Sequence, residues 1–256
     1  MKIASWNVNS LRVRLEHVMT WLDSAKPDVL ALQETKTKDE EFPVAAFADA
    51  GYEISYSGQP TYNGVAIVSR KPAIDIQTDL ESFDDAQRRV LGATIDGVRV
   101  LNLYVPNGQS VESDKYTYKL SWLDALTKQL EHDLARYERL VVLGDFNIAP
   151  EDRDVHDPEE WFGKVLCSDP ERNALNNILN LGLVDTFRLM EQDAGHYSWW
   201  DYRAAAFRRK RGMRIDLVLA SNDLSKSCKS ATIDVEPRRW ERPSDHTPVI
   251  AEFASD

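Results

Sequence analysis

Val-Val-Leu-Gly-Asp-Phe-Asn, residues 141–147, is the segment around which the expected fold of this chain is arranged. Three apolar residues, two of them β-branched, predict a short buried strand that ends at Gly144. Asp145 and Asn147 follow at once, and α/β folds place their chemistry just beyond the ends of such strands. Taken alone, an acid and an amide in this position are also typical of an ordinary turn. The functional interpretation depends on other places in the chain that share this design.

Polar side chains follow other apolar runs in the same way. Asn7 and Glu34 each come directly after a short apolar run. Asp216 occupies one face of a strand predicted over 214–220, whose other face is apolar. Because the strand ends of a sheet sandwich can converge on one cleft, we expect a group of polar residues to meet there. The group comprises Asn7, Glu34, Tyr104, Asn107, Asp145, Asn147, Asp216, Asp245 and His246.

Carboxylates crowded into one cleft repel one another unless a cation lies among them. Oxygen ligands of this kind suit Mg²⁺ or Mn²⁺, whereas zinc is not expected because Cys167 and Cys228 are isolated and no His-x-x-x-His pair exists. Such an ion serves phosphoryl transfer by neutralising charge on the phosphate. Individually, Glu34 also fits a surface ion pair, and His246 fits a structural histidine unless Asp216 contacts it.

Helices and strands alternate irregularly along the chain. One amphipathic helix is predicted before Pro27, and another runs from the capping-box residue Ser168 to Gly182. A longer helix presents on one face Leu120, Leu123, Leu130 and Leu134. Because several strands follow one another in the middle of the chain, we expect an α/β fold with two packed sheets covered by helices, not a doubly wound parallel sheet. No linker is apparent, so residues 1–256 are expected to form one domain.

Composition places the chain among ordinary globular proteins. It is 43% hydrophobic and 29% charged, and its net charge of −11 argues against non-specific adhesion to nucleic acid. That charge does not exclude a nucleic-acid enzyme, since a bound metal and local basic patches can offset it. Residues 1–7 lack the apolar run of a signal peptide, and no segment approaches membrane-spanning length. With two unpatterned cysteines, a reducing cytoplasmic location and no membrane partner are expected.

Six motifs resemble those of the exonuclease III family, and they occur in family order over residues 6–246. They are Trp6-Asn7-Val8-Asn9-Ser10-Leu11-Arg12, Leu32-Gln33-Glu34, Tyr104-Val105-Pro106-Asn107, Gly144-Asp145-Phe146-Asn147-Ile148-Ala149-Pro150, Arg214-Ile215-Asp216 and Ser244-Asp245-His246. The resemblance implies a four-layer α/β sandwich, deoxyribonuclease I-like, with two mixed sheets packed face to face and flanked by helices. It also implies a monomeric, Mg²⁺-dependent repair nuclease, with Mn²⁺ as a substitute, that associates with the nucleoid. Its partner would be double-stranded DNA, where it would remove nucleotides from recessed 3′ ends, trim blocked 3′ termini and cut at abasic sites.

The same resemblance implies roles for individual residues. Glu34 would be the principal metal ligand, in a metal site comprising Asn7, Glu34, Asp145, Asn147, Asp245 and His246. Asp145 would orient or deprotonate the attacking water, and Asn147 would help to hold it. Tyr104 and Asn107 would contact the scissile phosphate, while Asp216 would orient His246 toward a non-bridging phosphate oxygen. The motifs do not decide whether Asp145 or His246 is the general base.

Two departures from the family pattern affect these expectations. Asn9 stands where some relatives carry Asp, which weakens the case for a second tightly held metal. The course of residues 149–167 also differs from better-known members. If this loop lines the DNA groove, the balance between abasic-site cutting and 3′-end trimming depends on it.

Residues 203–214 form the densest positive segment, with six basic residues and no acid. The pattern suits a strip that follows DNA phosphates, although a solvated basic loop has the same composition. Within this strip, Arg208 and Arg209 would bind substrate. By family position, Arg203 would probe the duplex, and a pocket for an extrahelical deoxyribose would be walled by Trp199, Met213 and Ile215. The tryptophans alone would equally suit a core.

Two other functions remain open from the sequence. A phosphatase or phosphodiesterase of the same fold, acting on a phospholipid or a small phosphoester, would use the same acids. The basic run 208–211 favours DNA over lipid. A non-catalytic DNA-binding module would need the basic segment but not the acids at 34, 145 and 216.

Overall fold

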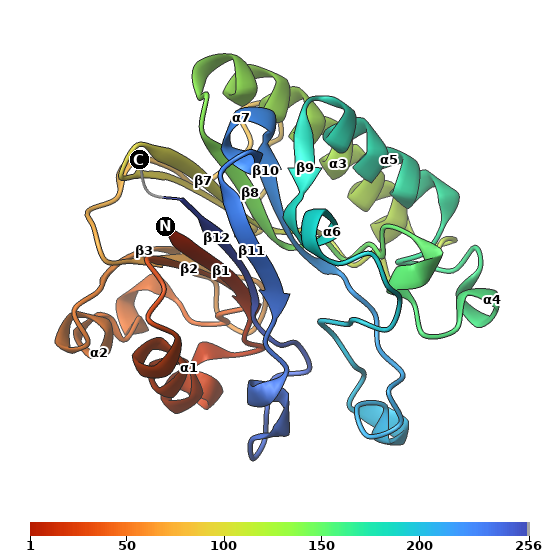
Figure 1. The fold of residues 1–256 in the computed structure, drawn as a ribbon, viewed down its shortest axis with the longest axis horizontal. Helices are drawn as coiled ribbons and strands as arrows, with labels where there is room; N and C mark the ends of the chain where they lie inside the picture. Colours follow the sequence, from red (N-terminus) through yellow and green to blue (C-terminus); the bar gives the residue numbers. More distant parts are fainter. Residues whose placement is uncertain (255–256) are drawn as a thin grey trace.

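Two six-stranded mixed β-sheets lie face to face in the computed structural model, which describes residues 1–254 (Figure 1). The first sheet has the order β11, β12, β1, β2, β4, β3, with bounds Cys228–Ile233, Val249–Phe253, Lys2–Asn7, Val29–Gln33, Val65–Ser69 and Glu53–Ser57. The second has the order β5, β6, β7, β8, β10, β9, with bounds Ile74–Gln77, Val90–Ile95, Val98–Tyr104, Leu140–Asp145, Asp216–Ser221 and Leu183–Asp185. The parallel pairs β1–β2 and β7–β8 lie inside these sheets, as a mixed topology requires.

Helices cover the two outer faces (Figure 1). α1 and α2 lie on the first sheet, and α3 and α5 on the second. The bounds are α1 Leu11–Ala25, α2 Val44–Asp49, α3 Asp114–Arg136, α4 Pro158–Trp161, α5 Asp169–Asn180, α6 Thr186–Met190 and α7 Asn222–Ser225. The arrangement is the expected four-layer sandwich. Within residues 1–254, no helix combines the length and apolar character needed to cross a bilayer.

The alternation of side chains along each strand produces three apolar layers. Along β8, Val141 and Leu143 face the core between the sheets, whereas Leu140 and Val142 face α3 and α5. The outer side of the first sheet packs against α1 and α2 in a third cluster. Asp145 continues the Val141–Leu143 row, so its side chain emerges at the edge of the inter-sheet core. The alternation of side chains along β8 therefore determines that Asp145 faces the space between the two sheets.

Gly144 does not end its strand, as the sequence had suggested, because β8 continues through Asp145. The backbone of Gly144 has φ +142°, and a Cβ atom there would lie 1.9 Å from the carbonyl oxygen of Leu103 on β7. Only glycine allows this approach of β8 to β7. The close contact carries β8 one residue further, to the position from which Asp145 reaches the site.

Two helices show how well the amphipathic patterns apply. α5 begins with the expected capping box, in which Ser168 and Glu171 each accept from the other's backbone N–H. On α3, Leu123 and Leu130 are buried as expected, but Leu120 is only partly buried. Lys119 lies on the buried face instead. The helix is therefore rotated relative to the leucine stripe, and a lysine enters the core.

A polar bridge joins the sheets beneath the site. Gln33 Nε2 on β2 donates to Asn102 Oδ1 on β7 at 2.7 Å and to Ser5 Oγ at 2.9 Å. Asn102 Nδ2 in turn donates to the carbonyls of Leu32 and Ala66, each at 2.9 Å. These side chains are fully buried, so the bonds specify how the sheets are aligned. The alignment places the ends of β1 and β2 opposite those of β7 and β8.

Candidate active site

Strand register gathers the predicted polar residues. In the second sheet, Asp145 pairs with Tyr104 on one side and with Asp216 on the other. In the first sheet, Asn7 pairs with Gln33, and Glu34 follows directly. β10 runs antiparallel to β8, so Asp216 begins its strand where Asp145 ends its own. Residues far apart in the chain therefore meet at one end of the sandwich.

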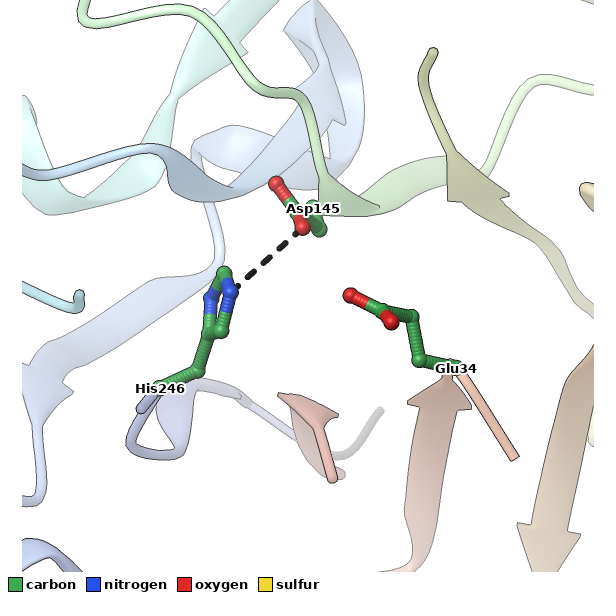
Figure 2. Close-up of side chains that lie close together, drawn as sticks. All are labelled: Glu34, Asp145 and His246. Carbon is green, nitrogen blue, oxygen red and sulfur yellow. Dashed lines mark ion pairs between the residues drawn. The ribbon is translucent and has the colours of Figure 1, made fainter. Parts of the chain in front are cut away.

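Glu34, Asp145 and His246 point toward one another across the gap between the sheets (Figure 2). One ligand atom from each lies within 4.8 Å of the others, close enough for all three to surround a single ion. Asn7 Nδ2 donates to Glu34 Oε1 and to Asp145 Oδ2, both at 2.9 Å. The amide nitrogen of Asn7 thus holds one carboxylate from each sheet, and its Oδ1 accepts from the backbone of Asn9.

His246 is held between two carboxylates. Its Nδ1 lies 2.8 Å from Asp216 Oδ2, and its Nε2 lies 3.6 Å from Asp145 Oδ2. Burial lowers the pKa of His246, but Asp216 and Asp145 outweigh that effect and raise it to about 10. The contact with Asp216 is the one that the functional interpretation of His246 requires. The neighbouring carboxylates therefore favour the protonated ring in the metal-free site, where Nε2 faces Asp145.

Asp145 is buried with charged groups of both signs around it. Burial raises its pKa, His246 and the bond from Asn7 lower it, and Asp216 and Glu34 raise it; the result is about 7. The upward shift means that negative charge at this position is not fully compensated by protein groups. Asp216 Oδ1 is likewise buried without a hydrogen-bond partner in the described chain. Hard oxygen donors with uncompensated charge fit a divalent cation such as Mg²⁺ or Mn²⁺.

Asn147 and Asn107 are joined beside the acids. Asn107 Nδ2 donates to Asn147 Oδ1 at 3.0 Å, and Asn147 Nδ2 donates to the carbonyl of Val105, also at 3.0 Å. The backbone N–H of Asn147 donates to Asp145 Oδ1 at 2.9 Å and fixes that carboxylate. These bonds leave each amide group with a second N–H for a ligand.

Tyr104 lies at the rim of the same cluster. Burial, with the nearby carboxylates of Glu34 and Asp145, holds the pKa of its phenol well above the usual value. The guanidinium of Arg89 lies over the ring, 4.7 Å from its centroid. Tyr104 therefore presents a neutral hydroxyl, a hydrogen-bond donor, at any pH near neutrality.

Asp245 belongs to a second group of residues around Asn9. Asp245 Oδ2 accepts from Trp199 Nε1 and its Oδ1 accepts from Asn9 Nδ2, both at 3.0 Å. Lys36, which sequence reasoning missed, donates to Asn9 Oδ1 at 2.6 Å and pairs with Glu34 Oε2 at 3.0 Å. Its position two residues after Glu34 was the available signal. Asn9 thus links Asp245 to the Glu34 side of the site.

The residues expected to wall a sugar pocket form a small cluster of their own. Met213 and Ile215 are fully buried, and Trp199 packs half-buried at their edge. Backbone bridges join Met213 to Trp199 and to Val155 in the loop before α4. The distinctive segment 149–167 therefore packs directly against the residues beside Asp216.

The basic segment divides into exposed and buried members. Arg203 is exposed and pairs with Asp201, the closest N–O distance being 2.6 Å. Arg208 and Arg209 are exposed, and among residues 1–254 no ion pair is recorded for either. Arg214 is instead 1% exposed and forms ion pairs with two buried or half-buried carboxylates, Asp154 and Asp185. The exposed basic surface therefore consists of Arg203 and residues 208–211.

Known proteins resemble this chain in sequence over nearly its whole length. A family model described as the Endonuclease/Exonuclease/phosphatase family matches residues 4–246. The exodeoxyribonuclease III of Haemophilus influenzae is 33% identical over 266 residues, covering 99% of this chain and 100% of that protein. An exodeoxyribonuclease of Bacillus subtilis is 31% identical and covers 97% of this chain and 98% of its own length.

Solved structures agree with the sequence comparison. A 3′ phosphatase from Neisseria, bound to product DNA hairpin, is 48% identical with a TM-score of 0.98 and full coverage of both chains. An AP endonuclease from Archaeoglobus fulgidus is 40% identical with a TM-score of 0.96, again with full coverage of both chains. The similarity thus extends over all the elements that carry the site.

Proposed function

This chain belongs to the endonuclease/exonuclease/phosphatase family and, within it, to the exonuclease III enzymes, and we propose that it is a Mg²⁺-dependent nuclease acting on damaged double-stranded DNA. We assign it three activities: 3′→5′ exonuclease, trimming of blocked 3′ ends, and cleavage at abasic sites. The observation that carries the proposal is the convergence of Glu34, Asp145 and His246 within 4.8 Å. Relatives named exodeoxyribonuclease, 3′ phosphatase and AP endonuclease support the range of activities.

Glu34 and Asp145 would hold the ion, with one carboxylate from each sheet. When bound, Mg²⁺ neutralises charge on the phosphate and stabilises the departing oxygen. Asn7 keeps the two carboxylates together through its hydrogen bonds to both. Because these bonds come from the strand ends, the ligands are in place before substrate arrives.

Asp145 is the group best suited to act as general base. Without a metal, burial raises its pKa to about 7. A bound cation would favour the ionised carboxylate, which is the form that accepts a proton. His246 is a weaker candidate, because its Nδ1 is bound to Asp216 and the neighbouring carboxylates raise its pKa, which favours the protonated ring. The bond from the backbone of Asn147 fixes the Asp145 carboxylate, which would then face the attacking water. The water proton would pass to Asp145 as the water oxygen bonds to phosphorus and the ester bond breaks.

Hydrogen-bond donors stabilise the charge that develops on the phosphate. Asp216 binds His246 Nδ1, so the other ring nitrogen is available to donate to a non-bridging phosphate oxygen. The neutral hydroxyl of Tyr104 and the free N–H of Asn107 would donate beside it. The exposed arginines 208 and 209 would bind neighbouring phosphates of the duplex.

One set of duplexes tests the proposal. A 3′-phosphorylated end, a recessed 3′ end and an internal abasic analogue would be incubated with the protein in Mg²⁺, in Mn²⁺ and in EDTA. We expect release of phosphate, of mononucleotides and of a nicked strand respectively, in both metals and not in EDTA. Failure of every duplex to react in Mg²⁺, or hydrolysis unaffected by EDTA, would contradict the proposal.

A further inference from the structure

Lys119 is a fully buried lysine on the core face of α3. Lysine is almost never fully buried unless its ammonium group is paired. The side chain points away from solvent and toward the loops that follow β7 and β8. Those loops carry Asn107 and Asn147, but no role in the site has so far been given to α3.

The ammonium group of Lys119 contacts both loops. Its Nζ donates to the backbone carbonyl of Asn147 at 2.7 Å and to that of Asn107 at 3.1 Å. The third partner is the buried carboxylate of Glu171 on α5. An ammonium group has three N–H donors, so each has one acceptor here. The contacts connect the loops that hold the two asparagines.

Glu171 does more than close the capping box of α5. In addition to Ser168, it accepts from the backbone N–H of Leu166 at 3.0 Å. The carbonyl of Leu166 accepts from the backbone N–H of Ala149, two residues beyond Asn147. The Lys119–Glu171 pair therefore holds the chain segment containing Asn147 from both of its sides.

We propose that Lys119 is a positioning residue, which sets the placement of Asn107 and Asn147 against the scissile phosphate. The inference rests on the proposed function, since it concerns how that site is held. Asn147 has φ +49°, in the left-handed region, so its conformation needs support from its surroundings. A buried ion pair by itself rarely adds stability over an apolar pair of the same volume, so stability alone gives little reason for a lysine here.

Substitution of both members of the pair separates positioning from stability. Lys119→Met leaves Glu171 as an uncompensated buried charge, so we expect a lower melting temperature and a kcat on 3′-phosphorylated duplex reduced about 100-fold. KM for the duplex should stay unchanged, because the exposed arginines still bind DNA. In the double variant Lys119→Met with Glu171→Gln, the buried charge is gone and the melting temperature should recover in part relative to Lys119→Met, while kcat stays low. Recovery of kcat together with stability would overturn the proposal.

A coupling measurement identifies the residue through which Lys119 acts. Asn147→Gly removes the amide side chain, and glycine accepts the positive φ at this position without strain. If Lys119 acts by placing Asn147, adding Lys119→Met to Asn147→Gly should lower kcat by less than threefold further, far less than in the wild-type background. Full multiplication of the two effects on kcat would overturn the proposal.

Gln129 provides the matched control on the same helix. It is buried on α3 and hydrogen-bonded to Asp133 and to the backbone of Glu81, outside the site. Gln129→Leu should lower the melting temperature and leave kcat within twofold of wild type. A loss of kcat equal to that of Lys119→Met would show that instability alone is responsible.

Wild-type protein without activity would reject the proposed function itself. An active wild type with unchanged kcat in Lys119→Met would reject only the inference.

Discussion

Asp145 and His246 bind protons more tightly in the folded, metal-free protein than they would in an unfolded chain. The pKa of Asp145 rises from 3.8 to about 7, and that of His246 rises from 6.5 to about 10. A raised pKa contributes stability that is complete below the unfolded value and is lost as the pH rises through the folded value. Burial is the first cause for Asp145, whereas the surrounding carboxylates outweigh burial for His246.

The contribution of these two groups to the free energy of unfolding of the metal-free protein should therefore fall as the pH rises from about 4 to about 10. Asp145 accounts for the lower half of this range, and His246 for the upper half. Denaturant titrations in EDTA at a series of pH values would measure the fall. In His246→Gln the histidine's share of the loss is removed, while the pKa of Asp145 rises further because His246 no longer lowers it, so the pH profile should change shape. A profile identical to that of the wild type would assign the loss to other groups.

Gly144→Ala tests the close approach that brings Asp145 to the site. The new methyl group would lie 1.9 Å from the carbonyl oxygen of Leu103, so β8 has to move away from β7. We expect a destabilisation of more than about 3 kcal/mol and loss of hydrolysis. Gly97→Ala is the control, since φ there is +77° and nothing lies within 4 Å. Gly97→Ala should lower the free energy of unfolding by only about 1 kcal/mol, which is the cost of a left-handed backbone for alanine. Equal losses for Gly97→Ala and Gly144→Ala in denaturant unfolding would contradict the account.

At the scale of elements, the exposed basic loop before β10, which contains residues 208–211, is expected to bind DNA. Replacing Arg208 and Arg209 by alanine should weaken duplex binding for every sequence and reduce the slope of log affinity against log salt by about 2. The slope would be measured by fluorescence anisotropy with a duplex lacking damage, in EDTA.

The control for this loop removes two positive charges elsewhere. Lys71 lies in the turn after β4, at the end of the first sheet away from the site. Lys128 lies on the exposed face of α3. Alanine at both positions lowers the net charge equally and should leave the salt slope unchanged. An identical slope in the arginine variant and wild type would remove the loop from the interface.

Local sequence patterns predicted most elements and many site residues because those patterns act over a few positions. The strand at 141–143 and the capping box of α5 follow from period and capping alone. Alternation correctly places Asp216 on the face opposite Leu217 and Leu219, but that face is not polar, because Val218 and Ala220 on it belong to the core between the sheets. The family motifs then indicated which strand ends meet. None of these signals needs the three-dimensional contacts to be known.

Long-range contacts explain what the sequence did not reveal. Gly144 resembled a strand terminator, but its φ and its contact with Leu103 continue the strand. Arg214 was expected in the basic strip. It is buried instead, because it forms ion pairs with Asp154 and Asp185 in two distant segments of the chain. The burial of Lys119 could not be predicted from the helix pattern, because its three acceptors come from three separate parts of the chain.

At the scale of the whole molecule, the candidate site lies between the two sheets. Glu34 follows a strand of the first sheet and Asp145 ends a strand of the second. An ion shared by them would bind only the folded arrangement, so Mg²⁺ should raise the melting temperature. At 100 times its dissociation constant the expected gain is about 2.7 kcal/mol. Differential scanning calorimetry with Mg²⁺ and with EDTA would measure it, and a Glu34→Gln variant should show no gain; an equal gain there would place the ion elsewhere.

The central claim is that Glu34 and Asp145 share a divalent ion with which a DNA phosphodiester is hydrolysed. The most direct test is the rate of phosphate release from a 3′-phosphorylated duplex as a function of Mg²⁺ concentration, in wild type and in Glu34→Gln. The account predicts saturation by Mg²⁺ in wild type and a rate about 1000-fold lower in the variant, equivalent to several kcal/mol of transition-state stabilisation. The same rate and the same half-saturating Mg²⁺ concentration in both proteins would contradict it.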